Sequence, residues 1–176
     1  GATCRTVAAH AKYYKKWAKT WEFQALLKAR AAAGDKRVGK AYIDTVWPMV
    51  WSAVEREGFF ADTRAMRRRV EESIPAETAG REIKLGPGGL RDIEFSVQLM
   101  QMVHGRTDES LRVRPTLQAL DALAQGGYIG RDSARKLADA YRFLRVVEHR
   151  MQMQRMSRTH LFPQNPQAER RVGRSL

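Results

Sequence analysis

Charged side chains surround a glycine-rich turn in the middle of the sequence, and they are the first candidates for chemistry. The stretch from Ile83 reads Ile-Lys-Leu-Gly-Pro-Gly-Gly-Leu-Arg-Asp-Ile-Glu-Phe. Lysine and arginine can contact a phosphate, and glycine amides at the start of a helix can add hydrogen-bond donors. We therefore predict phosphate contacts from Lys84, Gly88, Gly89 and Arg91.

Carboxylates extend this charged set. Asp92 and Glu94 follow the turn, and Glu148 falls in the middle of an apolar helical stripe, close to Arg150. A buried carboxylate needs partners, because desolvating an unpaired charge is costly. Two interpretations remain open: a buried ion-pair network that joins two helices, or a polar wall that faces a cleft. The candidate residues for either are Lys84, Arg91, Asp92, Glu94, Glu148 and Arg150.

The sequence supports no metal cluster and no nucleophile triad, so we assign no catalytic residue and no metal ligand. The histidines have no i, i+4 pairing, and Cys4 stands alone. Asp92 and Glu94 would point about 200° apart on a helix, which does not suit a two-metal site. The glycine turn also lacks the Gly-Lys-Ser/Thr ending of a P-loop.

Apolar periodicity predicts a mainly α fold, a multi-helix bundle with at most one short extended segment near residues 81–86. Helix breakers and caps divide the chain into elements. We expect one long helix from Arg5 to about Ala33, a second over 37–56 that Pro48 kinks or breaks, and a third over 64–73. Beyond a loop at 74–80 we expect helices over Leu90–His104, Thr116–Gln125 and from Asp132 or Ser133 to about Met156.

These elements suggest three parts. Pro75, Thr78 and Gly80 mark a boundary, so residues 1–80 form one part and residues 81–163 a helical bundle. Residues 164–176 follow Pro163 and contain Pro166 and several arginines, and we predict a frayed tail there.

The composition describes an ordinary globular protein with a strong positive charge. The net charge is +13, with 43% apolar and 29% charged residues. One cysteine fits a reducing compartment, and no segment is predicted to enter a membrane, so we expect a cytoplasmic protein. The chain lacks an initiator Met, which suggests a piece of a longer protein. Binding to nucleic acid or another acidic partner is the alternative function, but residues 1–80 carry +6 and residues 81–176 carry +7, without a basic tail.

Several motifs, in order along nearly the whole chain, resemble one family. The stretch Lys-Leu-Gly-Pro-Gly-Gly-Leu-Arg-Asp-Ile-Glu-Phe (84–95) is similar to the signature of the glutamine synthetase adenylyltransferase/adenylyl-removing enzymes. So are Trp-Ala-Lys-Thr-Trp-Glu (17–22), Ala-Leu-Leu-Lys-Ala-Arg (25–30), Ala-Tyr-Arg-Phe-Leu-Arg (140–145) and Glu-His-Arg (148–150).

The resemblance implies a nucleotidyltransferase that adds AMP to a tyrosine of glutamine synthetase and removes it by phosphorolysis, under control of the PII signalling protein. Arg91-Asp92 after the glycine pair is more similar to the amino-terminal, AMP-removing half. The family uses Mg²⁺ and a nucleotide (ATP or ADP), but its metal-binding carboxylates have no match here, so we expect neither bound tightly and the chain inactive alone. Residues 1–80 would then be the trailing helices of a polymerase-β-like nucleotidyltransferase domain whose catalytic sheet is missing, and residues 81–163 the helical domain after it.

Overall fold

The chain folds almost entirely into helices. The computed structural model describes residues 4–157 and 159–176. Within them are eight α-helices, three short 3-10 helices (Ala53–Glu55, Ala79–Arg81 and Glu109–Leu111) and one isolated β-bridge, Glu82 to Leu161. This confirms the predicted mainly α fold. The α-helices are α1 (Val7–Lys16), α2 (Thr20–Leu26), α3 (Lys36–Ser52), α4 (Phe59–Glu72), α5 (Leu90–His104), α6 (Thr116–Gln125), α7 (Arg131–Arg155) and α8 (Pro166–Arg174).

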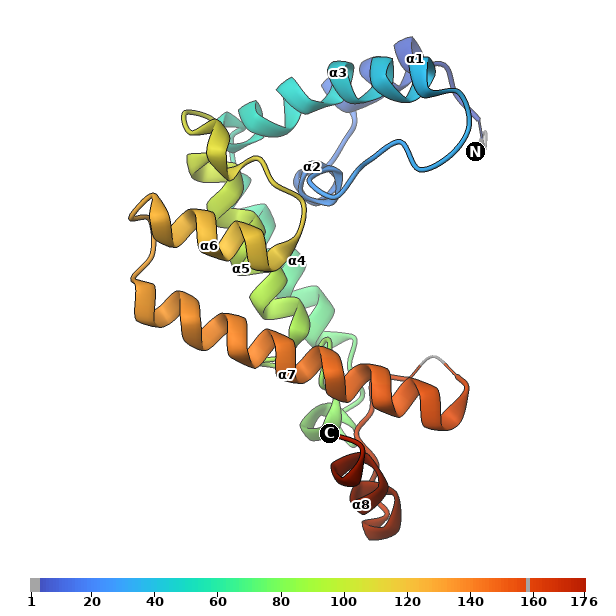
Figure 1. Ribbon diagram of the computed structural model, residues 1–176. Coiled ribbons are helices and arrows are strands. Elements are labelled where there is room, and N and C mark those ends of the chain that lie inside the picture. Colours follow the sequence, from blue (N-terminus) through green and yellow to red (C-terminus); the bar gives the residue numbers. More distant parts are fainter. Residues whose placement is uncertain (1–3, 158) are drawn as a thin grey trace.

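The helices form an elongated arrangement with α1 and α3 at one end and α8 at the other (Figure 1). α1 packs along α3, and α2 packs against both α3 and α4. α5 runs through the middle of the molecule, where it contacts α2, α3, α6 and α7. α7 lies across α5 and α6 and extends beyond them toward α8 (Figure 1).

The prediction of one long helix from Arg5 to Ala33 is wrong, because the chain breaks between α1 and α2. Ala18 is buried at the break, and its carbonyl accepts a hydrogen bond from Arg56 Nη2 at 3.0 Å instead of a helical amide. Glu22 then accepts from the backbone N–H of Lys19 at 2.9 Å and begins a new helix. The cause is tertiary, and no helix breaker marks it in the sequence.

The second predicted helix is confirmed over most of its length. α3 runs through the exposed Pro48 without ending, and its last predicted residues form a 3-10 turn. Trp47 and Trp51 pack edge to face, with ring centroids 6.0 Å apart, on the side of the core.

Two apolar clusters share α5. The first is formed by α2, α3 and the start of α4, and it takes Met102 from α5. The second is formed by α6 and its flanks, and it takes Ile93 and Val97 from α5. Gln101, fully buried between them, donates from Nε2 to the carbonyls of Leu111 and Val113 at 2.6 and 2.8 Å. This side chain therefore holds the loop before α6 against α5.

Residues 164–176, predicted to fray, instead form α8. Asn165 caps this helix by accepting from the N–H groups of Gln167 and Ala168, and Pro166 occupies the first turn. Val172 is buried with Val147 and Met151 of α7. The predicted frayed tail is therefore wrong, because a cap and one buried apolar contact order it.

Candidate functional site

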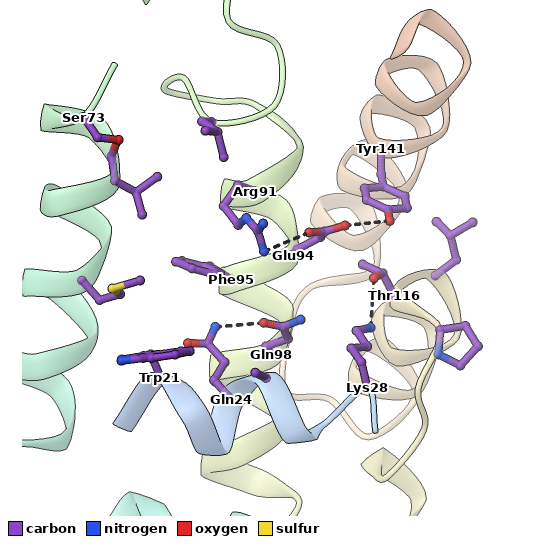
Figure 2. Close-up of a pocket in the computed structure, with 16 residues that line it drawn as sticks. Trp21, Gln24, Lys28, Ser73, Arg91, Glu94, Phe95, Gln98, Thr116 and Tyr141 are labelled. Carbon is purple, nitrogen blue, oxygen red and sulfur yellow. Dashed lines mark hydrogen bonds and ion pairs between the residues drawn. The ribbon is translucent and has the colours of Figure 1, made fainter. Parts of the chain in front are cut away.

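Segments from five helices surround a pocket of about 880 Å³ (Figure 2). Its walls are mostly apolar, and a few polar side chains converge on it, as in many ligand sites. The pocket is lined by Trp21, Gln24, Ala25, Lys28, Met66, Val70, Ser73, Leu85, Arg91, Glu94, Phe95, Gln98, Pro115, Thr116, Leu117 and Tyr141.

A pair of amides joins the two main walls. Gln24 of α2 donates from Nε2 to Gln98 Oε1 of α5 at 3.0 Å, and both side chains are buried (Figure 2). Trp21, one turn before Gln24, remains 46% exposed where it lines the pocket. The amide pair fixes α2 against α5, so the indole has a defined place at the edge of the pocket.

Arg91 and Glu94 form the charged part of the pocket. Arg91 Nη1 lies 3.8 Å from Glu94 Oε2, and its guanidinium stacks over the Phe95 ring at 5.4 Å. Tyr141 of α7 donates its hydroxyl to Glu94 Oε1 at 3.1 Å (Figure 2). Burial raises the pKa of the Tyr141 phenol, and its hydrogen bond to the Glu94 carboxylate acts in the same direction. The loosely paired Arg91 is thus the group most able to receive an anion.

Lys28 closes the opposite side of the pocket. Its ammonium donates to the carbonyl of Arg114 and to Thr116 Oγ1, the latter at 3.2 Å. Burial lowers the pKa of Lys28, and the negative charge of Glu94 opposes this shift in part. Lys28 therefore ties α2 to the start of α6 as well as lining the pocket.

Hydrogen bonds to other groups of the chain fix the glycine turn. Asp92 accepts from the Gly88 N–H at 2.7 Å and pairs with Arg67 of α4, while the Gly89 N–H donates to the Gly86 carbonyl at 3.0 Å. To contact a phosphate, the Gly88 and Gly89 N–H groups would have to give up these hydrogen bonds. Phosphate binding by the two glycines therefore remains a prediction.

Glu148 of α7 is the centre of a buried ion-pair network. Its carboxylate is 2% exposed and lies 3.1 Å from Lys84 Nζ, 2.6 Å from Arg145 Nη1 and 3.2 Å from His160 Nδ1. The network joins α7 to the segment that leads into the glycine turn and to the segment that leads out of α7. Arg150, by contrast, is exposed.

The structure thus distributes the six predicted charged residues over several places. Arg91 and Glu94 line the pocket, Asp92 braces the turn, Lys84 meets Glu148, and Arg150 points to solvent. The sequence prediction missed the pocket residues Trp21, Gln24, Lys28 and Tyr141. One signal was present, since Lys28 lies within an otherwise apolar stretch.

The donor atoms here do not fit a Mg²⁺ site. Among the described residues, no group of three His, Cys, Asp or Glu side chains is placed to hold a metal ion. Asp92 and Glu94 are each engaged with an arginine, and Glu148 is surrounded by basic groups. In the part of the chain that the structure describes, no helix is long and apolar enough to cross a membrane.

Two family models match the chain. The model for GlnD PII-uridylyltransferase matches residues 64–176, and the model for glutamate-ammonia ligase adenylyltransferase matches residues 1–45.

Bacterial relatives match along nearly all of it. A protein of Mycolicibacterium smegmatis is 62% identical over 163 residues, 93% of this chain and 16% of that protein. One of Streptomyces avermitilis is 59% identical over 176 residues, 100% of this chain and 18% of that protein. Both carry the name bifunctional glutamine synthetase adenylyltransferase/adenylyl-removing enzyme. The chain therefore spans less than a fifth of the length of these relatives.

Proposed function

Since its residues 64–176 match the GlnD PII-uridylyltransferase model, the chain belongs to that family, and we propose that it forms one wall of the cleft in which an enzyme transfers AMP to and from glutamine synthetase. The names of the relatives support the reaction, because both describe adenylyl transfer and removal on glutamine synthetase.

One observation carries the proposal. The pocket takes side chains from four of the stretches that resemble the adenylyltransferases: Trp21 from 17–22, Lys28 from 25–30, Arg91 and Glu94 from 84–95, and Tyr141 from 140–145. These stretches are spread over residues 17–145 of the chain, yet they meet in one cavity. A shared cavity gives these four patterns a common role.

Within this cleft, Arg91 is assigned to the phosphate of AMP. Its side chain is more than a third exposed, lines the pocket, and makes a long contact with Glu94 besides its stacking on Phe95. The Phe95 ring lies beside it, and Trp21 adds a second flat apolar surface elsewhere in the same pocket. Arginine suits this role because its fork of donors matches phosphate geometry.

We also propose that the chain belongs to the amino-terminal, AMP-removing half of the enzyme. The support for this is the Arg91-Asp92 pair that follows the glycines. Residues 1–80 would be the trailing helices of a nucleotidyltransferase domain, and the helices after residue 81 the domain that follows. Mg²⁺ and a nucleotide would be held by parts of the enzyme outside this chain, since the donors described here do not fit the metal. Glutamine synthetase and the PII protein are the proposed partners, in the cytoplasm.

The test is release of AMP from adenylylated glutamine synthetase with Mg²⁺ and phosphate. This chain alone would be compared with a chain extended at its amino terminus by a nucleotidyltransferase domain. We expect release only from the longer chain. Release by the short chain would overturn the assignment of the metal site, whereas no release from either would remove support for the AMP-removing half.

Arg91→Met in the longer chain tests the role of the pocket. We expect kcat to fall by about 100-fold, a typical result of removing one charge-stabilising donor. Arg37→Met is the matched control, because Arg37 is almost fully exposed in a surface ion pair. Equal effects of the two substitutions would count against the pocket as the cleft.

A further inference from the structure

The amide pair of Gln24 and Gln98 divides the pocket into two ends of different character. Figure 2 shows Lys28 and Thr116 beyond Gln98 on one side, and Trp21 beside Gln24 on the other. The first end offers an ammonium group and a hydroxyl group, whereas the second offers an indole ring. The two ends are therefore suited to different parts of one ligand.

The indole of Trp21 has an uncovered face at its end of the pocket. It is about half exposed, and no ring or cation of the described residues stacks on it. Met66 and Val70 of α4, the helix that packs against α2, add apolar walls to the same pocket. A flat ring stacked on the indole would remove this apolar surface from water.

Phe95 supplies a second flat surface. The Arg91 guanidinium lies over its ring at 5.4 Å, and Figure 2 shows Arg91 on one side of the Phe95 ring and Trp21 on the other. One face of the phenyl ring is thus used by Arg91, and the other is on the side of the indole. A ring bound between the two aromatic side chains would have the guanidinium beyond Phe95.

Gln24 adds a single hydrogen-bond acceptor at this end. Its Nε2 is used by Gln98 Oε1 at 3.0 Å, so its own Oε1 is the atom left over. Gln24 is only 6% exposed, yet no described residue donates to that oxygen, which lies on the side of Trp21 (Figure 2). A nearly buried acceptor gains from a ligand that offers it an N–H group.

We infer that this end of the pocket, called the base slot below and defined by Trp21, Gln24 and Phe95, holds adenine. The aromatic rings stack on the base, and its 6-amino group donates to Gln24 Oε1. Guanine and hypoxanthine carry an oxygen at position 6, which would meet the Gln24 oxygen, acceptor against acceptor. The inference rests on the proposed function, since it adds the base of the nucleotide whose phosphate Arg91 is proposed to hold.

The test uses ligands without phosphate, so that binding does not depend on Arg91. Adenosine and inosine, which differ at position 6, are titrated into the chain by isothermal titration calorimetry. We expect adenosine to bind about tenfold more tightly than inosine, because inosine leaves Gln24 Oε1 without a donor.

Two substitutions locate the binding. Trp21→Leu and Gln24→Met should each weaken adenosine binding about tenfold, and Gln24→Met should also remove the preference over inosine. Trp17→Leu is the matched control, because Trp17 is also exposed but does not line the pocket, and it should leave the affinity unchanged. Thermal melting checks that each variant is folded. The comparison with inosine needs no variant, so it decides the question even if Gln24→Met loses stability.

Three results would overturn the base slot: no binding of adenosine, equal or tighter binding of inosine, or the same loss with Trp17→Leu as with Trp21→Leu. Failure of the proposed function has a different signature. If adenosine binds as expected but the longer chain releases no AMP, the base slot stands and the proposed reaction falls. If the longer chain releases AMP and depends on Arg91, while adenosine does not bind, the reaction stands and the base slot falls.

Discussion

At the scale of single residues, the surroundings of Glu148 explain how the chain holds a carboxylate in an apolar stripe. Lys84, Arg145 and His160 approach it from three segments, so the charge is compensated although the side chain is buried. A buried carboxylate of this kind fixes how the segments that it joins lie relative to one another, whatever its net contribution to stability.

Glu148→Gln should destabilise the fold by about 3 kcal/mol, the lower end of the range for breaking a buried ion pair. The lower end applies because Lys84 and Arg145 remain partly exposed and can still reach water. Urea unfolding, followed by tryptophan fluorescence, measures the loss.

Lys84→Met is the companion change and should cost less, about 1.5 kcal/mol, because Glu148 keeps Arg145 and His160. If Glu148→Gln left the urea midpoint unchanged, the ion pairs would not contribute to stability. A larger cost for Lys84 than for Glu148 would place the centre of the network elsewhere.

The partner of Glu148 shows what the sequence could reveal at this scale. The apolar stripe of α7 identified Glu148 as buried, which the structure bears out. Lys84 and Arg150 were both in the predicted set with Glu148, but Arg150 is two residues away, and residues two apart lie on different sides of a helix. Arg145 is three residues before Glu148, and that spacing alone favoured it. Lys84 was in the predicted set because it flanks the glycine turn, whereas His160 was not, and helical spacing indicates neither of them.

At the scale of elements, an alanine in the glycine turn should cost different amounts of stability at Gly88 and at Gly89. A Cβ on Gly89 would lie 2.7 Å from the Ile83 carbonyl oxygen and 2.9 Å from that of Gly86, so backbone would have to move. Gly88 has open space but a φ of +72°. Gly88→Ala should therefore cost about 1–2 kcal/mol through its left-handed backbone, and Gly89→Ala should cost more.

Gly173→Ala in α8 is the control for these two changes. It has open space and an ordinary helical backbone, so it should stabilise the protein by about 0.5–1 kcal/mol. Melting temperatures of the three variants give the ranking. If Gly89→Ala were the mildest of the three, the turn would be more adaptable than its contacts indicate.

Elements bounded by local signals were predictable, and those bounded by tertiary contacts were not. Leu90–His104 and Thr116–Gln125 were predicted with the observed limits, because glycines mark their ends. The break at Ala18 depends on Arg56, which is distant in sequence. α8 was missed although Asn165-Pro166 is an ordinary start of a helix.

At the scale of the whole molecule, tyrosines tie separate elements together and make the fold sensitive to alkali. The pKa is raised for Tyr13 by its hydrogen bond to Glu22, for Tyr14 by burial, for Tyr128 by its hydrogen bond to Asp108, and for Tyr141 by burial. The folded protein therefore keeps protons that the unfolded chain loses above about pH 10.

Stability from these tyrosines should be fully present below about pH 10 and decline as the pH rises through their folded pKa values. Lys28 acts in the opposite direction, since its lowered pKa makes the unfolded chain the better proton binder. Four tyrosines outweigh one lysine, so we expect the urea midpoint to fall above pH 10. Absorbance of phenolate measures the titration directly.

Tyr14→Phe is the informative control for the alkaline decline. It removes the tyrosine whose pKa is raised most by burial, so the decline should become shallower. A urea midpoint that stayed flat up to pH 12, about two units above the ordinary tyrosine pKa, would show that these phenols ionise without opening the fold.

The pocket could not be predicted from the sequence at this scale. Its walls come from residues more than a hundred positions apart, such as Trp21 and Tyr141. The walls from α2, α5 and α7 contain quoted motifs, whereas those from α4 and α6 do not, and periodicity does not say which helices pack together. The interpretation as a cleft wall therefore rested on the charged residues around the glycine turn and on resemblance, and the shared cavity was found only in three dimensions.

The position of α5 in two apolar clusters has a consequence for how the protein unfolds. Met102 belongs to the cluster of α2 and α3, while Ile93 and Val97 belong to that of α6, and all three lie on one helix. Neither cluster can open without disturbing that helix, so the two should lose structure together in one cooperative transition. Hydrogen exchange should then show the amides of α3, α5 and α6 opening with the same free energy, while α8 exchanges earlier. Separate transitions would mean that the boundary near residue 80 divides two independent folding units.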